Sequence, residues 1–222
     1  MRRILQPTIA MKGSGHPALA SPTTMSLDPL FEQLRHPNPN MQSRARVALA
    51  QSDDPDVVPR LMAMLSEADV PLRRSAVKAL GTVGEKSVQP LTNQLAASDD
   101  PTIGSSCCKG LAQVADQWVG FPFPALTLDL LCEKALAGNP VVQITAVMAL
   151  GEMGESALSR LRRILAEGDP AVQVACVNAL ASLGIPEAEA DLKATCDNEA
   201  MDSYVRESAE SAIARLSMTM RR

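Results

Sequence analysis

One segment recurs along the chain in a fixed register, and this repetition constrains the fold more than any other feature of the sequence. The best copies are VPLRRSAVKALGTVGE at 70–85, PVVQITAVMALGEMGE at 140–155 and PAVQVACVNALASLGI at 170–185. The segment 101–116 keeps the same register, and the segments 39–54 and 203–218 fit it with more drift. Because such a unit buries its apolar side against its neighbours, the sequence predicts a repeat architecture.

When the six copies are aligned, equivalent positions carry residues of the same kind, either apolar or small. The offsets between these columns place them on one face of an α-helix. The first apolar column is Met41, Leu72, Ile103, Val142, Val172 and Val205. A small column follows: Ala45, Ala76, Cys107, Ala146, Cys176 and Ala209. The next two columns are Leu49, Leu80, Leu111, Leu150, Leu180, Ile213, and then Ser52, Val83, Val114, Met153, Leu183, Leu216. We expect the small column to let neighbouring helices approach closely.

Helix boundaries are also encoded. Residues that cap helix N-termini share one register position: Asp69, Asp100, Asn139, Asp169 and Asp202. Prolines suited to a first turn are Pro39, Pro101, Pro140 and Pro170, and glycines suited to a helix end are Gly84, Gly154 and Gly184. Shorter amphipathic segments precede each copy, at 28–36, 55–67, 87–97, 126–137, 156–167 and 187–196. The chain is therefore predicted to be an all-α solenoid of about six helix pairs, each an A helix followed by a B helix.

Composition agrees with this fold and excludes some functions. The chain is 46% hydrophobic but only 2% aromatic, which suits close helix–helix packing better than a sheet. Its formal charge of −4 argues against a nucleic-acid partner, and no apolar run approaches the roughly 20 residues of a membrane span. The five cysteines have no paired spacing, which favours a reducing cytoplasm.

We expect two regions in the chain: residues 1–24 as a disordered leader, and 25–222 as a single solenoid. The leader is basic, lacks acidic residues and is interrupted by proline and glycine. It resembles a transit peptide weakly; the alternatives are a disordered extension, or an upstream start codon with Met25 as the natural first residue.

An insertion interrupts the repeat near 116–125. Leu111 and Leu150 stand 39 residues apart, whereas the other steps in that column are 30 to 33. Three of the few aromatic residues fall there: Trp118, Phe121 and Phe123. Two hypotheses stay open, a surface loop that contacts a partner and a plug that fills the gap between repeats three and four.

Cations gather on the B segments of the first three repeats. Arg73 and Arg206 share one column and Arg74 follows it, while Arg44, Arg46, Lys78 and Lys109 add to them. We take Arg73, Arg74 and Arg206 as candidate binding residues for an acidic partner or ligand carboxylates; the alternative is an ordinary solvated helix face. The B segments of repeats four and five are apolar on nearly every side, which indicates either burial or an apolar contact face.

No complete catalytic set is visible. His16 and His36 have no positioned partner, and there is no glycine-rich phosphate loop. Cys107 and Cys176 lie two repeats apart, about 20 Å at roughly 10 Å per layer, so they cannot share a metal ion. We interpret the cysteines as structural and predict no metal site.

The strings ADVPLRRSAVKALGTVGE, NPVVQITAVMALGEMGE and DSYVRESAESAIARL resemble a cyanobacterial HEAT-repeat family. It includes the E and F subunits of phycocyanobilin lyases, phycobilisome degradation protein B and a HEAT partner of an A-type iron–sulfur carrier. In HEAT arrays the B helices line the concave groove. The likeness covers about residues 27–218 and matches no catalytic motif.

The resemblance implies a cytoplasmic protein of phycobilisome antenna assembly or turnover, whose partner is a phycobiliprotein subunit or a second HEAT-type subunit. It implies no covalently bound cofactor, and a phycocyanobilin-type bilin as candidate ligand, with its two propionates at the basic half of the groove. Whether the chain is a lyase-like subunit or a non-enzymatic scaffold, for instance for an iron–sulfur carrier, stays open.

Overall fold

The computed structural model describes residues 26–219, and the environments of their side chains through residue 216. Within that range the helices form six consecutive pairs. The A helices are α1 (Asp28–Leu34), α3 (Val57–Ala63), α5 (Glu85–Ala97), α7 (Ala125–Leu136), α9 (Leu158–Glu167) and α11 (Pro186–Asp197). The B helices are α2 (Pro39–Ala50), α4 (Val70–Val83), α6 (Pro101–Gln117), α8 (Pro140–Glu152), α10 (Pro170–Leu183) and α12 (Ser203–Thr219). Short 3₁₀ segments, η1 (Met64–Ser66) and η2 (Gly154–Ala157), extend α3 and precede α9.

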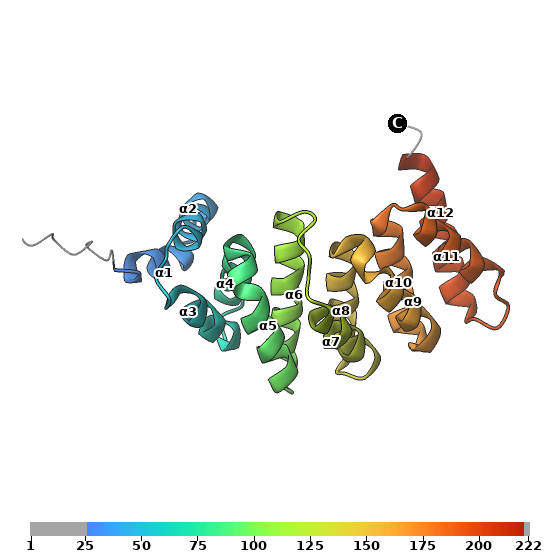
Figure 1. The fold of residues 1–222 in the computed structure, drawn as a ribbon, viewed down its shortest axis with the longest axis horizontal. Coiled ribbons are helices and arrows are strands. Elements are labelled where there is room, and N and C mark those ends of the chain that lie inside the picture. Colours follow the sequence, from blue (N-terminus) through green and yellow to red (C-terminus); the bar gives the residue numbers. More distant parts are fainter. Residues whose placement is uncertain (1–25, 220–222) are drawn as a thin grey trace, which may run out of the picture.

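The pairs stack side by side in one row, so the molecule is elongated (Figure 1). Each B helix packs on the B helices of the adjacent pairs, in the order α2, α4, α6, α8, α10 and α12. The A helices form a second layer, in which α3 contacts α5, α5 contacts α7 and α7 contacts α9. The predicted α-solenoid of about six pairs is therefore confirmed. The expectation of a leader at 1–24 lies outside the described residues.

The predicted columns form the core. Every residue of the small column, including Cys107 and Cys176, is fully buried. The leucines that follow this column are also fully buried, whereas Ile213 in the same register is half-buried. Ile213 lies in the last of the described pairs. The side chains of the small column let adjacent B helices approach closely, and the leucines fill the remaining space between them.

Four of the five predicted N-caps make their hydrogen bond. Asp100, Asn139, Asp169 and Asp202 each accept from a backbone N–H of the first turn, at 2.7 to 3.0 Å. Asp69 does not, and that prediction is wrong. In α4 the proline stands one position later, so Pro71 removes the N–H that this side chain would otherwise reach. The predicted glycine ends are confirmed, because Gly84, Gly154 and Gly184 all have positive φ.

The insertion is a loop that joins α6 to α7 and runs beside α6 to the start of α7 (Figure 1). Phe121 and Phe123 meet edge to face with ring centroids 4.9 Å apart. Phe123 is buried and Phe121 packs against the core, which is the packing that the plug hypothesis predicts for these two rings. Trp118 and Val119 stay exposed at 48% and 93%. One loop thus combines anchored rings with an exposed tip.

Candidate functional site

A groove of about 760 Å³ crosses the B helices α4, α6 and α8. These helices lie next to one another because their small columns pack closely, so side chains at equivalent register positions line one continuous surface. Arg74 and Lys78 come from α4, Ser105 and Lys109 from α6, and Thr145 and Met148 from α8. The second to fourth B helices therefore share one large groove.

Three exposed cations line this groove without a partner in the described part of the chain. Arg74 and Lys78 stand four residues apart on α4, and Lys109 faces them from α6. None of the three makes an ion pair or a side-chain hydrogen bond to another residue of the described chain. Their charges are consequently available to an anionic ligand.

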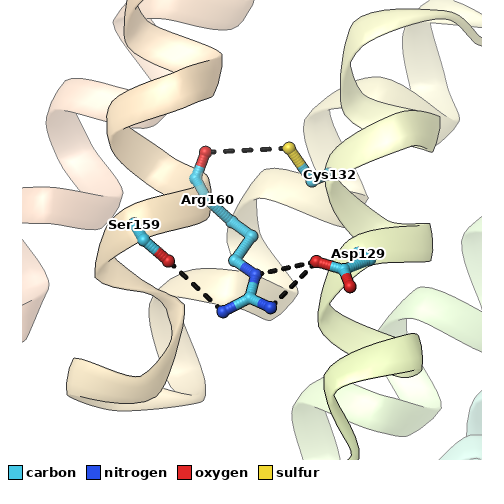
Figure 2. A network of polar contacts seen from close by, with 4 residues as sticks. All are labelled: Asp129, Cys132, Ser159 and Arg160. Carbon is cyan, nitrogen blue, oxygen red and sulfur yellow. Dashed lines mark hydrogen bonds and ion pairs between the residues drawn. The ribbon is translucent and has the colours of Figure 1, made fainter.

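Cations on the A helices differ from those of the groove, because several of them form ion pairs. Among residues 26–213, each ion pair has at least one member on an A helix. Figure 2 shows one example, in which Arg160 of α9 donates to Asp129 of α7 from Nε at 2.9 Å, while the Cys132 thiol donates to the carbonyl oxygen of Arg160. Carboxylates therefore compensate six cations of the A helices but none of the three in the groove, within the described part of the chain.

Between the cations the groove is apolar and carries hydroxyl groups. Val141 and Met148 on α8 are 55% and 61% exposed, and both line the groove. Ser106 donates to the carbonyl oxygen of Thr102 at 2.6 Å, and Thr145 donates to that of Val141 at 2.8 Å. Since each hydroxyl proton is used within its own helix, the oxygen lone pairs can still accept from a ligand. The surface suits a ligand with both apolar and anionic parts.

The opposite end of the groove is acidic. Asp116 near the end of α6 and Glu152 at the end of α8 line it. Both also line a second hollow of about 460 Å³, together with Glu155 and the loop residues Val119 and Phe121. The groove and the second hollow share residues, so the exposed surface continues from the cations of α4 to the insertion loop.

The structure separates the predicted cationic site residues. Arg74 lines the groove, as does Arg73, but the Arg73 guanidinium donates to the backbone carbonyls of Glu67 and Ala68. Gln42 and Gln173, in the same column, donate likewise to the carbonyls of His36 and Leu165. This position therefore ties the end of an A helix to the following B helix.

Arg206 lies on α12, two B helices beyond the groove, and its buried Nε has no hydrogen-bond partner. The predicted trio thus does not form one site. The predicted aromatic residues also lie outside this groove. Phe123 is in the core, and Trp118 packs against the turn after α4.

Sequence reasoning named Lys78 and Lys109 as additional cations but missed Met148, Asp116 and Glu152 as groove residues. Met148 belongs to a segment that is apolar on nearly every side. In such a segment the sequence alone does not distinguish a core residue from a groove residue. The register offered a signal, because Lys78, Lys109 and Met148 occupy the same position in their repeats.

Four of the five cysteines are buried, and Cys196 is half-buried. Burial raises the pKa of Cys107, Cys108 and Cys176 to about 12, so these thiols stay protonated at neutral pH. Among the described residues, no group of three histidine, cysteine, aspartate or glutamate side chains is arranged to hold a metal ion. The described helices also include none with the length and apolar character of a membrane span.

A family model described as HEAT repeats matches residues 27–117 and 128–214. The interval between the two matched segments contains the insertion loop. The chain belongs to the HEAT-repeat family, as its stacked pairs and continuous B-helix groove also indicate.

The chain is similar to named relatives over nearly their whole length. It is 43% identical to the uncharacterized phycocyanin operon protein Z of Pseudanabaena tenuis, over 87% of this chain and 96% of that protein. It is 27% identical to the bilin biosynthesis protein CpeZ of a Synechococcus strain, over 77% and 95%. A solved structure of the CpcE and CpcF complex of phycocyanin lyase from Nostoc superposes with a TM-score of 0.42 and 24% identity, covering 90% of this chain and 79% of that one.

Proposed function

We propose that this protein acts in phycobilisome chromophore attachment, transfer or turnover, and that its groove across α4, α6 and α8 binds a phycobiliprotein or its bilin. The relative named for bilin biosynthesis and the one named for a phycocyanin operon support this context. A cytoplasmic location follows from the same proposal. The groove supplies the physical argument.

The single observation that carries the proposal is the set of uncompensated cations beside an apolar surface. Arg74, Lys78 and Lys109 have no carboxylate partner among residues 26–219, although the A layer repeatedly pairs its cations. A bilin has two propionates and a chain of apolar rings, so its carboxylates would lie at these cations and its rings against Val141 and Met148. Arginine suits a carboxylate because its planar fork can donate two parallel hydrogen bonds.

In this proposal the chain's own residues bind and orient the ligand. The cations hold the carboxylates, the apolar side chains exclude water from the rings, and the hydroxyl oxygens of Ser105, Ser106 and Thr145 can accept from ring N–H groups. The thiols of Cys107, Cys108 and Cys176 are buried and protonated, so the proposal gives them no part in holding the bilin.

The test compares two variants with the same loss of charge. The groove variant replaces Arg74, Lys78 and Lys109 with Gln. The control variant replaces Arg35, Arg163 and Lys193 with Gln, since these exposed cations lie in the A layer outside the groove. Binding of phycocyanobilin is followed by absorbance, and binding of isolated phycobiliprotein subunits by calorimetry.

We expect the groove variant to bind about tenfold more weakly than the wild type, because three exposed ion pairs together are worth roughly 1.4 kcal/mol. The control should retain wild-type affinity. Equal affinity of both variants would move the site out of the groove. If the wild type bound neither ligand but captured an A-type iron–sulfur carrier, the scaffold alternative would replace the proposal.

A further inference from the structure

The acidic end of the groove has no role in binding propionates. Asp116, Glu152 and Glu155 are exposed, and none of them makes an ion pair or a side-chain hydrogen bond within the described part of the chain. Like charges gathered at one place repel one another, so the isolated protein gains nothing from this arrangement. A cationic group on a bound partner would compensate these carboxylates.

The two charged ends are separated by a distance that suits a folded segment. From α4 to α8 are two helix spacings of 8–10 Å each, and Glu152 lies several residues further along its helix than Arg74 does. The diagonal from the cations to the carboxylates is therefore about 20 Å. Val77 and Met148 lie between the two ends, as does Lys109 on α6, so the middle of this path combines apolar side chains with one cation.

An α-helix fits this path better than an extended strand. A helix of about 14 residues spans about 20 Å and presents side chains at spacings of three and four along one side. Its groove-facing side can then carry a carboxylate, two apolar residues and a cation in that order. An extended segment of the same length has about six residues, of which alternate ones point away.

We propose that the groove receives an amphipathic helix of the partner protein, whose acidic end lies at Arg74 and Lys78 and whose basic end lies at Asp116 and Glu152. This inference rests on the proposed function, because it identifies the part of the partner that the same groove binds. The apolar side of the helix covers Met148, and its basic end extends toward the second hollow beside Val119.

The test uses three synthetic helical peptides of about 14 residues with the same leucine stripe. One carries Glu in its first turn and Lys in its last, the second carries Glu at both ends, and the third carries Lys at both ends. Fluorescence anisotropy measures the binding of each peptide to the wild type and to two charge-reversal variants. One variant combines Arg74→Glu with Lys78→Glu, and the other combines Asp116→Lys with Glu152→Lys.

The wild type should bind the mixed peptide at least fivefold more tightly than either of the others. The first variant should prefer the peptide with Lys at both ends, and the second the peptide with Glu at both ends. Circular dichroism checks that both variants stay folded, which their exposed positions favour. Preferences that did not follow the reversals, or a wild type that bound the all-Glu peptide equally well, would overturn the inference.

The same samples are titrated with phycocyanobilin and with phycobiliprotein subunits. If the wild type bound these ligands in the groove but ignored all three peptides, the proposed function would stand and the helix inference would fall. If it bound the peptides but neither of these ligands, the groove would serve a different partner and the proposed function would fall.

Discussion

The indole Nε1 of Trp118 donates a hydrogen bond of 3.1 Å to the carbonyl oxygen of Gly81, although the two residues are 37 positions apart. Gly81 belongs to α4, and Trp118 begins the insertion loop after α6. The ring also covers Gly84, where an added β-carbon would lie 2.5 Å from ring carbon Cε2. The side chain therefore links the ends of two successive B helices and the start of the inserted loop.

Replacing Gly84 with alanine should destabilise the fold more than the same change at Gly154. Both glycines have positive φ, 74° and 71°, but only the first has a neighbour within 4 Å of an added β-carbon. We expect Gly154→Ala to lower the free energy of unfolding by about 1 kcal/mol, and Gly84→Ala by at least twice that. Adding Trp118→Ala should relieve part of the larger effect, which urea denaturation of the double variant measures. Strictly additive effects would contradict the contact.

Phe123 distinguishes the two hypotheses for the loop. Its ring is buried against Phe121, so Phe123→Ser should lower the free energy of unfolding by about 3 kcal/mol. Val119→Ser at the exposed tip of the same loop should leave stability unchanged within about 0.5 kcal/mol. Thermal melting compares the two variants. A stable Phe123→Ser variant would show that the ring is not part of the core.

Arg73 and Arg74 are neighbours with different roles, and single substitutions should separate them. Arg73→Gln should keep both stability and ligand affinity, because Gln173 makes the equivalent hydrogen bond to the preceding helix at 2.9 Å. Arg73→Ala should lower the free energy of unfolding by about 1 kcal/mol, because alanine cannot donate the hydrogen bonds that the Arg73 guanidinium makes to the end of the preceding A helix. Arg74→Gln should weaken ligand binding only. Calorimetry and urea denaturation together check the pattern, and a loss of binding in Arg73→Gln would return that residue to the site.

The fold was predictable because each repeat carries its own signals. The Asp100 cap, the Pro101 first turn and the buried Leu111 all act within one helix or between adjacent pairs, so local sequence is sufficient for them. The site was less predictable because it depends on which charges find partners across elements. Nothing near Arg73 in the sequence shows that its guanidinium turns back to the Ala68 carbonyl.

Alkaline pH should destabilise the protein through its buried thiols. Burial raises the pKa of Cys107 and Cys176 to about 12 in the folded state, whereas the ordinary pKa of an exposed thiol is 9.0. Their contribution to stability is complete below pH 9 and is lost as pH rises toward 12, because only the unfolded state ionises there. At pH 10 the loss is on the order of 1 kcal/mol for each cysteine.

The control for this prediction is the double variant Cys107→Ala and Cys176→Ala, which places at both positions the alanine that other repeats have there. We expect its free energy of unfolding to fall less between pH 8 and pH 10 than that of the wild type. Identical pH profiles for the two proteins would show that these thiols do not control alkaline stability.

The most direct test of the groove as an anion-binding site is the salt dependence of phycocyanobilin affinity. Exposed charges are screened over about 8–10 Å at moderate ionic strength, so affinity that depends on Arg74, Lys78 and Lys109 must fall as salt rises. The measurement is the dissociation constant from 25 to 500 mM salt, for the wild type and for the variant with Gln at these three positions. We predict that wild-type affinity decreases steadily with salt, and that the variant is weaker at low salt and nearly independent of salt. The same salt dependence in both proteins would contradict the assignment of these cations to the ligand.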